Sequence, residues 1–230
     1  MSARVICISR ALAAGGETIG QLVSARLGFH YVDEEIITLA ADAARVDPAL
    51  VAKAEHRKSI LTRLLDAIAD RSLRHQALPA APSSYFSPST SPPSSKSSAK
   101  GHDTASSLAN LTRDAKALIR EAIVEVASRG QVVIVAHAAS FALGGVDGVL
   151  RVLVTASEKT RVRRIWLKGK LLSEAEASAA VTESDVARRD YLRDFYDVAQ
   201  EQPTDYDLVI NTDFLEPEQA ASCVIAAVNG

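Results

Sequence analysis

The chain has 230 residues, of which 47% are apolar and 23% charged, and its formal net charge is −2. This length suits one α/β domain, the apolar content excludes disorder along the whole chain, and the near-neutral charge argues against a general nucleic-acid binder. No apolar run approaches the ~20 residues that span a bilayer, and the first residues form no recognisable signal peptide. The two cysteines, Cys7 and Cys223, lie in apolar runs, which predicts buried, reduced thiols in a cytoplasmic protein.

Strands and helices alternate along the chain. Short apolar runs predict five strands, at 4–9, 29–32, 131–136, 150–155 and 207–211. Apolar residues at helical spacing predict helices at 17–27, 34–44, 59–78, 108–128, 157–168, 174–196 (broken near Val181) and 217–228, and one further helix that starts at 47. The fold class is therefore predicted to be α/β, a doubly wound five-stranded parallel sheet flanked by helices, with its ligand at the carboxyl ends of the strands.

One segment departs from this pattern. Residues 79–107 hold five of the eight prolines and eleven serines, but no Val, Ile or Leu. Such a segment cannot bury enough apolar surface to offset the entropy lost on ordering, so we interpret it as a disordered, Ser/Pro-rich insertion. Residues 1–230 are thus predicted to form a single domain that contains this flexible insertion.

The turn after the first strand is the first candidate site. Across residues 9–18 a strand, a turn of small residues and a helix N-terminus offer backbone N–H groups and a positive dipole end to a phosphate. The usual phosphate-loop pattern, G-x-x-x-x-G-K-[ST], is incomplete: with Gly15 on its second glycine, Gly16 stands at the lysine and Glu17 at the hydroxyl residue. Its first glycine position falls on Arg10. A turn that serves only helix packing would need the same glycines, so these residues leave both interpretations open.

The missing lysine bears on mechanism, because its ammonium neutralises charge on the β- and γ-phosphates. Arg10 is the nearest cation in sequence that could enter the same pocket. Glu17 would repel a polyphosphate unless Mg²⁺ lay between them, and Thr18 could supply the hydroxyl that faces the metal. Without such a replacement, phosphoryl transfer would be weak or absent.

Arginines gather in two predicted helices; they are Arg161, Arg163 and Arg164, then Arg188, Arg189 and Arg193. A guanidinium binds phosphate through two parallel hydrogen bonds and stays charged, but a solvated basic helix face shows the same pattern. Asp185 and Arg188, at i and i+3, could also simply pair with each other. His137 follows the third strand and either contacts an anionic substrate or is structural.

Five segments, spread over most of the chain outside the insertion, resemble the cytidylate kinase-like family of nucleoside monophosphate kinases, which have a P-loop kinase fold. They are Ile6-Cys7-Ile8-Ser9-Arg10 with Gly15-Gly16 and Ile19-Gly20; Phe29-His30-Tyr31-Val32-Asp33 with Ile36-Ile37; Leu153-Val154-Thr155-Ala156-Ser157-Glu158 leading to Arg163-Arg164; Asp185-x-x-Arg188 followed by 191–196; and 206–213 with Pro217-Glu218-Gln219. That family has a glycine at the lysine position, as at Gly16.

This resemblance implies Mg²⁺-dependent transfer of the γ-phosphoryl group of ATP to a nucleoside monophosphate, by analogy CMP or dCMP, without a nucleic-acid or membrane partner. Together with the residues discussed above, it assigns candidate roles: the ATP phosphates to Arg10, Ala13, Ala14, Gly15, Gly16, Glu17 and Thr18, Mg²⁺ to Thr18, the transferring group to Arg163, Arg164 and Arg188, and the monophosphate substrate to Asp33, His137 and Arg193.

The chain departs from the family pattern in two places. The turn reads Ala11-Leu12-Ala13-Ala14 where the family has a glycine and a serine, and Ala136-His137-Ala138 stands for Gly-Arg-Gly. Two alternatives therefore stay open: a nucleotide-binding regulatory module with little or no turnover, and a kinase for a non-nucleotide small molecule.

Overall fold

The structure, a computed structural model, describes residues 3–33, 35–44, 116–135, 138–168 and 173–229. Its elements in chain order are β1 (Val5–Arg10), α1 (Gly16–Leu27), β2 (His30–Val32), α2 (Glu35–Ala44), a helix over 116–128, β3 (Val132–Ile134), α6 (Ala139–Ala142), β4 (Val149–Thr155), α7 (Glu158–Lys168), α8 (Glu174–Tyr196), the 3₁₀ turn η1 (Pro203–Asp205), β5 (Leu208–Asn211) and α9 (Pro217–Asn229). The predicted helices from 47 onward and at 59–78, the predicted insertion at 79–107 and His137 lie outside the described residues.

The five strands form one sheet in the order β2-β3-β1-β4-β5, and every adjacent pair is parallel. The chain therefore builds β2 and β3 on one side of β1, and β4 and β5 on the other. A parallel sheet of this kind binds ligands in the crevice beyond the carboxyl ends of its strands, where the strand order reverses. The predicted fold class is confirmed, and the carboxyl end of the central strand β1 marks the place to look for a site.

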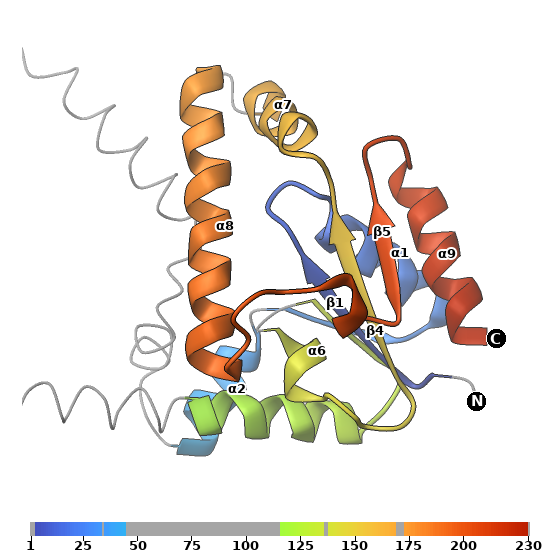
Figure 1. Ribbon diagram of the computed structural model, residues 1–230. Coiled ribbons are helices and arrows are strands. Elements are labelled where there is room, and N and C mark those ends of the chain that lie inside the picture. The colour runs from blue at the N-terminus through green and yellow to red at the C-terminus, as the bar shows by residue number, and fades with distance from the viewer. Residues whose placement is uncertain (1–2, 34, 45–115, 136–137, 169–172, 230) are drawn as a thin grey trace, which may run out of the picture.

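Both faces of the sheet are covered by helices (Figure 1). Ile6 and Ile8 point to the face covered by α1 and α9, while Val5 and Cys7 point to the face covered by α2 and the helix over 116–128. Successive side chains of a strand alternate between the faces, so a strand buried on both must be apolar throughout. This is why the central strands could be predicted from continuous apolar runs.

Two expectations are wrong. Helix α8 runs unbroken past Val181, because that side chain is fully buried against Val162 of α7, and the helix begins with a capping box between Ser173 and Glu176. Cys223 is exposed on α9 rather than buried. Cys7 is buried, which raises the pKa of its thiol to about 12 and keeps it protonated. Among the described helices none is long and apolar enough to cross a membrane.

Candidate functional site

The turn between β1 and α1 has the backbone shape of an anion site. Ala13 and Gly15 adopt left-handed conformations, with φ of 61° and 90°, and Gly15 leads directly into the helix. No described side chain caps this end of α1, so its first backbone N–H groups have no side-chain acceptor. The turn is fixed by hydrogen bonds from the Ala11 amide to Val154 O (3.0 Å) and from the Ala14 amide to Ala11 O (3.1 Å). Uncapped amides at the positive end of a helix attract phosphate.

A cluster of charged and polar side chains lies beside this turn. The Nε of Arg10 is 2.6 Å from Glu17 Oε1, and its Nη2 is 3.9 Å from Asp33 Oδ2. Tyr31 Oη donates to Asp33 Oδ2 at 3.3 Å. Burial, with the neighbouring Asp33 charge, raises the pKa of Tyr31, so the phenol stays a donor. The buried atom Asp33 Oδ1 makes no hydrogen bond with any residue that the structure describes, so it has unused capacity for a polar ligand.

Arg164 of α7 holds the turn from the other side. Its guanidinium donates to Ala13 O at 3.1 Å, to Thr212 Oγ1 at 2.9 Å and to Thr212 O at 2.5 Å. Thr212 Oγ1 in turn donates to Ala14 O at 2.8 Å. Arg164 therefore supports the backbone of the turn, whereas its neighbour Arg163 is exposed.

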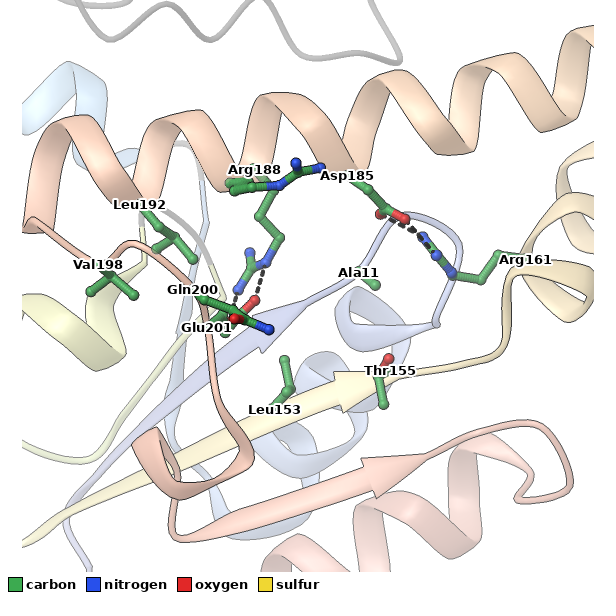
Figure 2. Close-up of a pocket in the computed structure, with 11 residues that line it drawn as sticks. Ala11, Leu153, Thr155, Arg161, Asp185, Arg188, Leu192, Val198, Gln200 and Glu201 are labelled. Atoms are coloured by element: carbon green, nitrogen blue, oxygen red, sulfur yellow. Dashed lines mark hydrogen bonds and ion pairs between the residues drawn. The ribbon is translucent and has the colours of Figure 1, made fainter.

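A pocket of about 280 Å³ opens between α8 and the carboxyl ends of β1 and β4 (Figure 2). Cationic, acidic and apolar side chains all contribute to its lining, which comprises Ala11, Leu153, Thr155, Arg161, Asp185, Arg188, Arg189, Leu192, Val198, Gln200 and Glu201. Because Ala11 belongs to the turn, the pocket and the turn form one continuous region. We call it the α8 pocket.

Both ion pairs in the α8 pocket differ from the pairing that spacing suggested. Asp185 does not pair with Arg188 but receives two hydrogen bonds of 2.7 Å from Arg161. Arg188 reaches down from α8 to Glu201, with Nε–Oε2 at 2.8 Å and Nη2–Oε1 at 2.5 Å (Figure 2). Tyr206 also donates to Glu201. Burial acts to raise the pKa of the Glu201 carboxyl, but the hydrogen bonds and charge of Arg188 outweigh it, so that pKa lies below its ordinary value.

Two predicted site residues lie apart from these contacts. Thr18 is exposed in the first turn of α1. Arg193 is exposed near the end of α8, where it pairs with Asp190 and Asp194 at 3.1 Å each, and it is outside the lining of the α8 pocket. The spacing analysis in turn missed Glu201, Tyr206 and Thr212, because they lie in or beside connecting segments without periodicity and approach the site only through the fold.

Comparison with known sequences identifies a relationship over most of the chain. A family model described as "Cytidylate kinase-like family" matches residues 5–214. No curated protein matches the chain.

Among solved structures, an uncharacterized protein from Eubacterium ventriosum aligns with a TM-score of 0.60 at 13% identity, over 98% of both chains. Shikimate kinase from Bacteroides thetaiotaomicron aligns with a TM-score of 0.50 at 13% identity, over 100% of both chains. At these identities the likeness shows the fold alone, and that fold is the one of the P-loop kinases.

Proposed function

The chain belongs to the cytidylate kinase-like family, and on that basis we propose that it transfers the γ-phosphoryl group of ATP to a nucleoside monophosphate, CMP or dCMP. The reaction breaks the bond between the β,γ-bridging oxygen and the γ-phosphorus. A phosphate oxygen of the acceptor takes the phosphoryl group, so the products are ADP and a nucleoside diphosphate.

One observation carries this proposal furthest: an uncapped helix N-terminus stands at the carboxyl end of the central strand with an arginine beside it. Gly15, at φ 90°, leads directly into α1, so the uncapped amides of the first helical turn would face an anion bound at this end. Phosphoryl transfer consists mainly of positioning and charge stabilisation, which such a frame supplies.

The remaining roles follow from where the side chains lie. The turn from Ala13 to Thr18 would hold the ATP phosphates, and the α8 pocket, which adjoins it, would bring Arg188 to the transferring group. Asp33 directly follows β2, and its Oδ2 lies 3.9 Å from Arg10 Nη2. It would face the acceptor together with the residues that follow β2. Arg163 and Arg164 are also assigned to the transferring group, and His137 and Arg193 to the acceptor.

The oxygens around the turn fit a magnesium ion. Mg²⁺ in such sites takes most of its ligands from phosphates and water and only one or two from the protein. Asp33 Oδ1 is buried without a hydrogen bond to any described residue, and the Glu17 carboxylate and Thr18 hydroxyl are both in the exposed first turn of α1. When bound, Mg²⁺ would neutralise charge on the β- and γ-phosphates. No three His, Cys, Asp or Glu residues of the described part form a metal site of their own, so the nucleotide would have to bring the ion.

A coupled assay of ADP release tests the proposal, with CMP, dCMP, UMP and AMP as acceptors, shikimate as a non-nucleotide acceptor, and ATP binding measured in parallel. We expect ADP release that depends on a pyrimidine monophosphate. ATP binding without turnover on any acceptor would overturn the kinase assignment. Turnover on shikimate alone would favour a small-molecule kinase.

The second candidate is a nucleotide-binding regulatory module, and the arginine contacts favour it. Arg188 is held by Glu201 and Arg164 by the backbone of the turn, so two of the three arginines assigned to the transferring group already have partners. A module of this kind would bind ATP and release no ADP with any acceptor of the panel.

A further inference from the structure

Arg10 and Gly16 lie so close together that a side chain at one position leaves no room for a side chain at the other. Gly16 is the first residue of α1, and its φ lies outside the left-handed region, so its backbone would accept any L residue. A Cβ added there, however, would lie 2.6 Å from Arg10 Cβ and 2.9 Å from Arg10 Cδ. Contacts this short between carbon atoms do not occur, and a Cβ is fixed by its own backbone. Only one of the two positions can carry a side chain.

The usual phosphate loop makes the opposite choice. In G-x-x-x-x-G-K-[ST] the first glycine corresponds to position 10 and the lysine to position 16. Here the order is reversed, with an arginine at position 10 and a glycine at position 16. The stem of Arg10 thus occupies the space above the helix N-terminus in which a lysine at position 16 would begin. The loss of the lysine and the presence of Arg10 are one change.

Among the described residues, the Arg10 guanidinium forms ion pairs with two acids beside the turn. Glu17 Oε1 lies 2.6 Å from Arg10 Nε, and Asp33 Oδ2 lies 3.9 Å from Arg10 Nη2. Glu17 is half exposed, while Arg10 has a side-chain exposure of 19%. A partly buried cation whose nearest partner is a half-exposed carboxylate suits a site in which an anionic ligand displaces that carboxylate.

We propose that Arg10 takes the part of the phosphate-loop lysine, binding nucleotide phosphate from the space that a side chain at position 16 would fill, with Glu17 holding its guanidinium until the phosphate replaces it. The inference rests on the nucleotide binding in the proposed function but not on phosphoryl transfer. A guanidinium forms two parallel hydrogen bonds to a phosphate, so it offers more directional contact than the ammonium it replaces.

A reciprocal exchange tests this assignment. The full chain and its variants Arg10→Gly, Gly16→Lys and the double variant are titrated with ATP and with adenosine. Arg10→Gly should weaken ATP binding about 10- to 100-fold, as expected for lost charge-assisted hydrogen bonds, and leave adenosine binding unchanged. Gly16→Lys alone should also weaken ATP binding, because its Cβ meets Arg10. The double variant restores the glycine and the lysine of the usual pattern. Its affinity for ATP should be at least tenfold higher than the affinity calculated by multiplying the losses of the two single variants.

Two further variants keep the outcome decisive. Arg10→Gln keeps the side-chain stem as far as Cδ but removes the charge, so it decides the question if Arg10→Gly does not fold. Arg26→Ala removes one charge from the other end of α1, where the arginine contacts Glu218 and Ser222, and should leave ATP binding unchanged.

The possible results separate the two proposals. If the wild-type chain binds no ATP, the proposed function itself fails. If it binds ATP and Arg10→Gly or Arg10→Gln binds ATP equally well, or loses ATP and adenosine binding equally, Arg10 is not the phosphate-binding cation. If the loss of ATP affinity in the double variant equals the product of the two single losses, a cation at position 16 does not substitute for one at position 10.

Discussion

Arg164 donates a hydrogen bond of 3.1 Å to the carbonyl oxygen of Ala13, 151 residues away in sequence. Ala13 has a φ of 61°, a conformation that costs a non-glycine residue about 1–2 kcal/mol. The contact helps to stabilise that strained residue at the centre of the turn, and it joins α7 to the turn. An arginine expected to neutralise phosphate thus also shapes the backbone that would hold it.

Removal of the Arg164 side chain should therefore disturb the turn. We expect Arg164→Ala to weaken ATP binding about tenfold and to lower the free energy of unfolding by about 1–3 kcal/mol, because three hydrogen bonds from a charged donor are lost. Isothermal titration and urea unfolding measure the two effects. Lys159→Ala removes an exposed charge from the same helix and should change neither quantity. Equal behaviour of the two variants would show that Arg164 does not support the turn.

Two left-handed glycines of α1 provide a matched pair. Gly15 precedes the helix with φ 90° and Gly28 follows it with φ 68°, and no described atom lies within 4 Å of an added Cβ at either position. Replacement by alanine should cost about 1 kcal/mol of stability at each, through backbone strain alone. Only Gly15→Ala should also weaken ATP binding, since only Gly15 shapes the turn. The same loss of ATP affinity in both variants would contradict a site at the turn.

The pair of Arg188 and Glu201 separates a structural role from a catalytic one. Arg188→Ala leaves a carboxylate of which only 20% of the side chain is exposed without its partner, and should cost at least about 2 kcal/mol. The double variant Arg188→Met/Glu201→Leu removes both charges and should recover most of that stability. ADP release should stay low in both variants if Arg188 contacts the transferring group. If the double variant recovers both stability and turnover, the Arg188–Glu201 pair has a structural role only.

Asp207 makes stability depend on pH. Hydrogen bonds from the Arg151 guanidinium, at 2.7 and 3.0 Å, hold the pKa of this carboxyl below its ordinary value of 3.8. A lowered pKa contributes stability that is complete well above 3.8 and is lost as the pH falls through the folded-state value. Urea unfolding between pH 6 and pH 2 should therefore show wild type more stable than Asp207→Asn near neutrality, with the difference shrinking in acid. A constant difference over this range would contradict the assignment.

The strands could be predicted from sequence to within one or two residues, because a central strand covered on both faces is a continuous apolar run, as at Val5 to Ile8 of β1. The break near Val181 was wrong because small residues around it, such as Ala177 and Ala180, weaken the apolar pattern although they pack tightly against α7. The spacing of apolar residues describes one helix at a time, and the contacts that keep α8 continuous come from another helix, α7.

The turn could be located from sequence, since its glycines and the strand before it lie together in the chain. The partners of its charged residues could not. Glu201 reaches Arg188 only because the segment after α8 folds back beneath that helix, and Arg161 reaches Asp185 across two helices (Figure 2). The mutual exclusion of Arg10 and Gly16 likewise exists only in three dimensions, because it depends on a Cβ approach of 2.6 Å.

The most direct test of the kinase assignment is the transfer of a radiolabelled γ-phosphoryl group from ATP to CMP by the full chain, with the products separated by chromatography. We predict that label appears in CDP, that its appearance requires Mg²⁺, and that Arg10→Gly reduces it by at least tenfold at sub-saturating ATP. Label that stays in ATP while the protein binds ATP at submillimolar concentration, with CMP and every other monophosphate tested, would contradict the assignment.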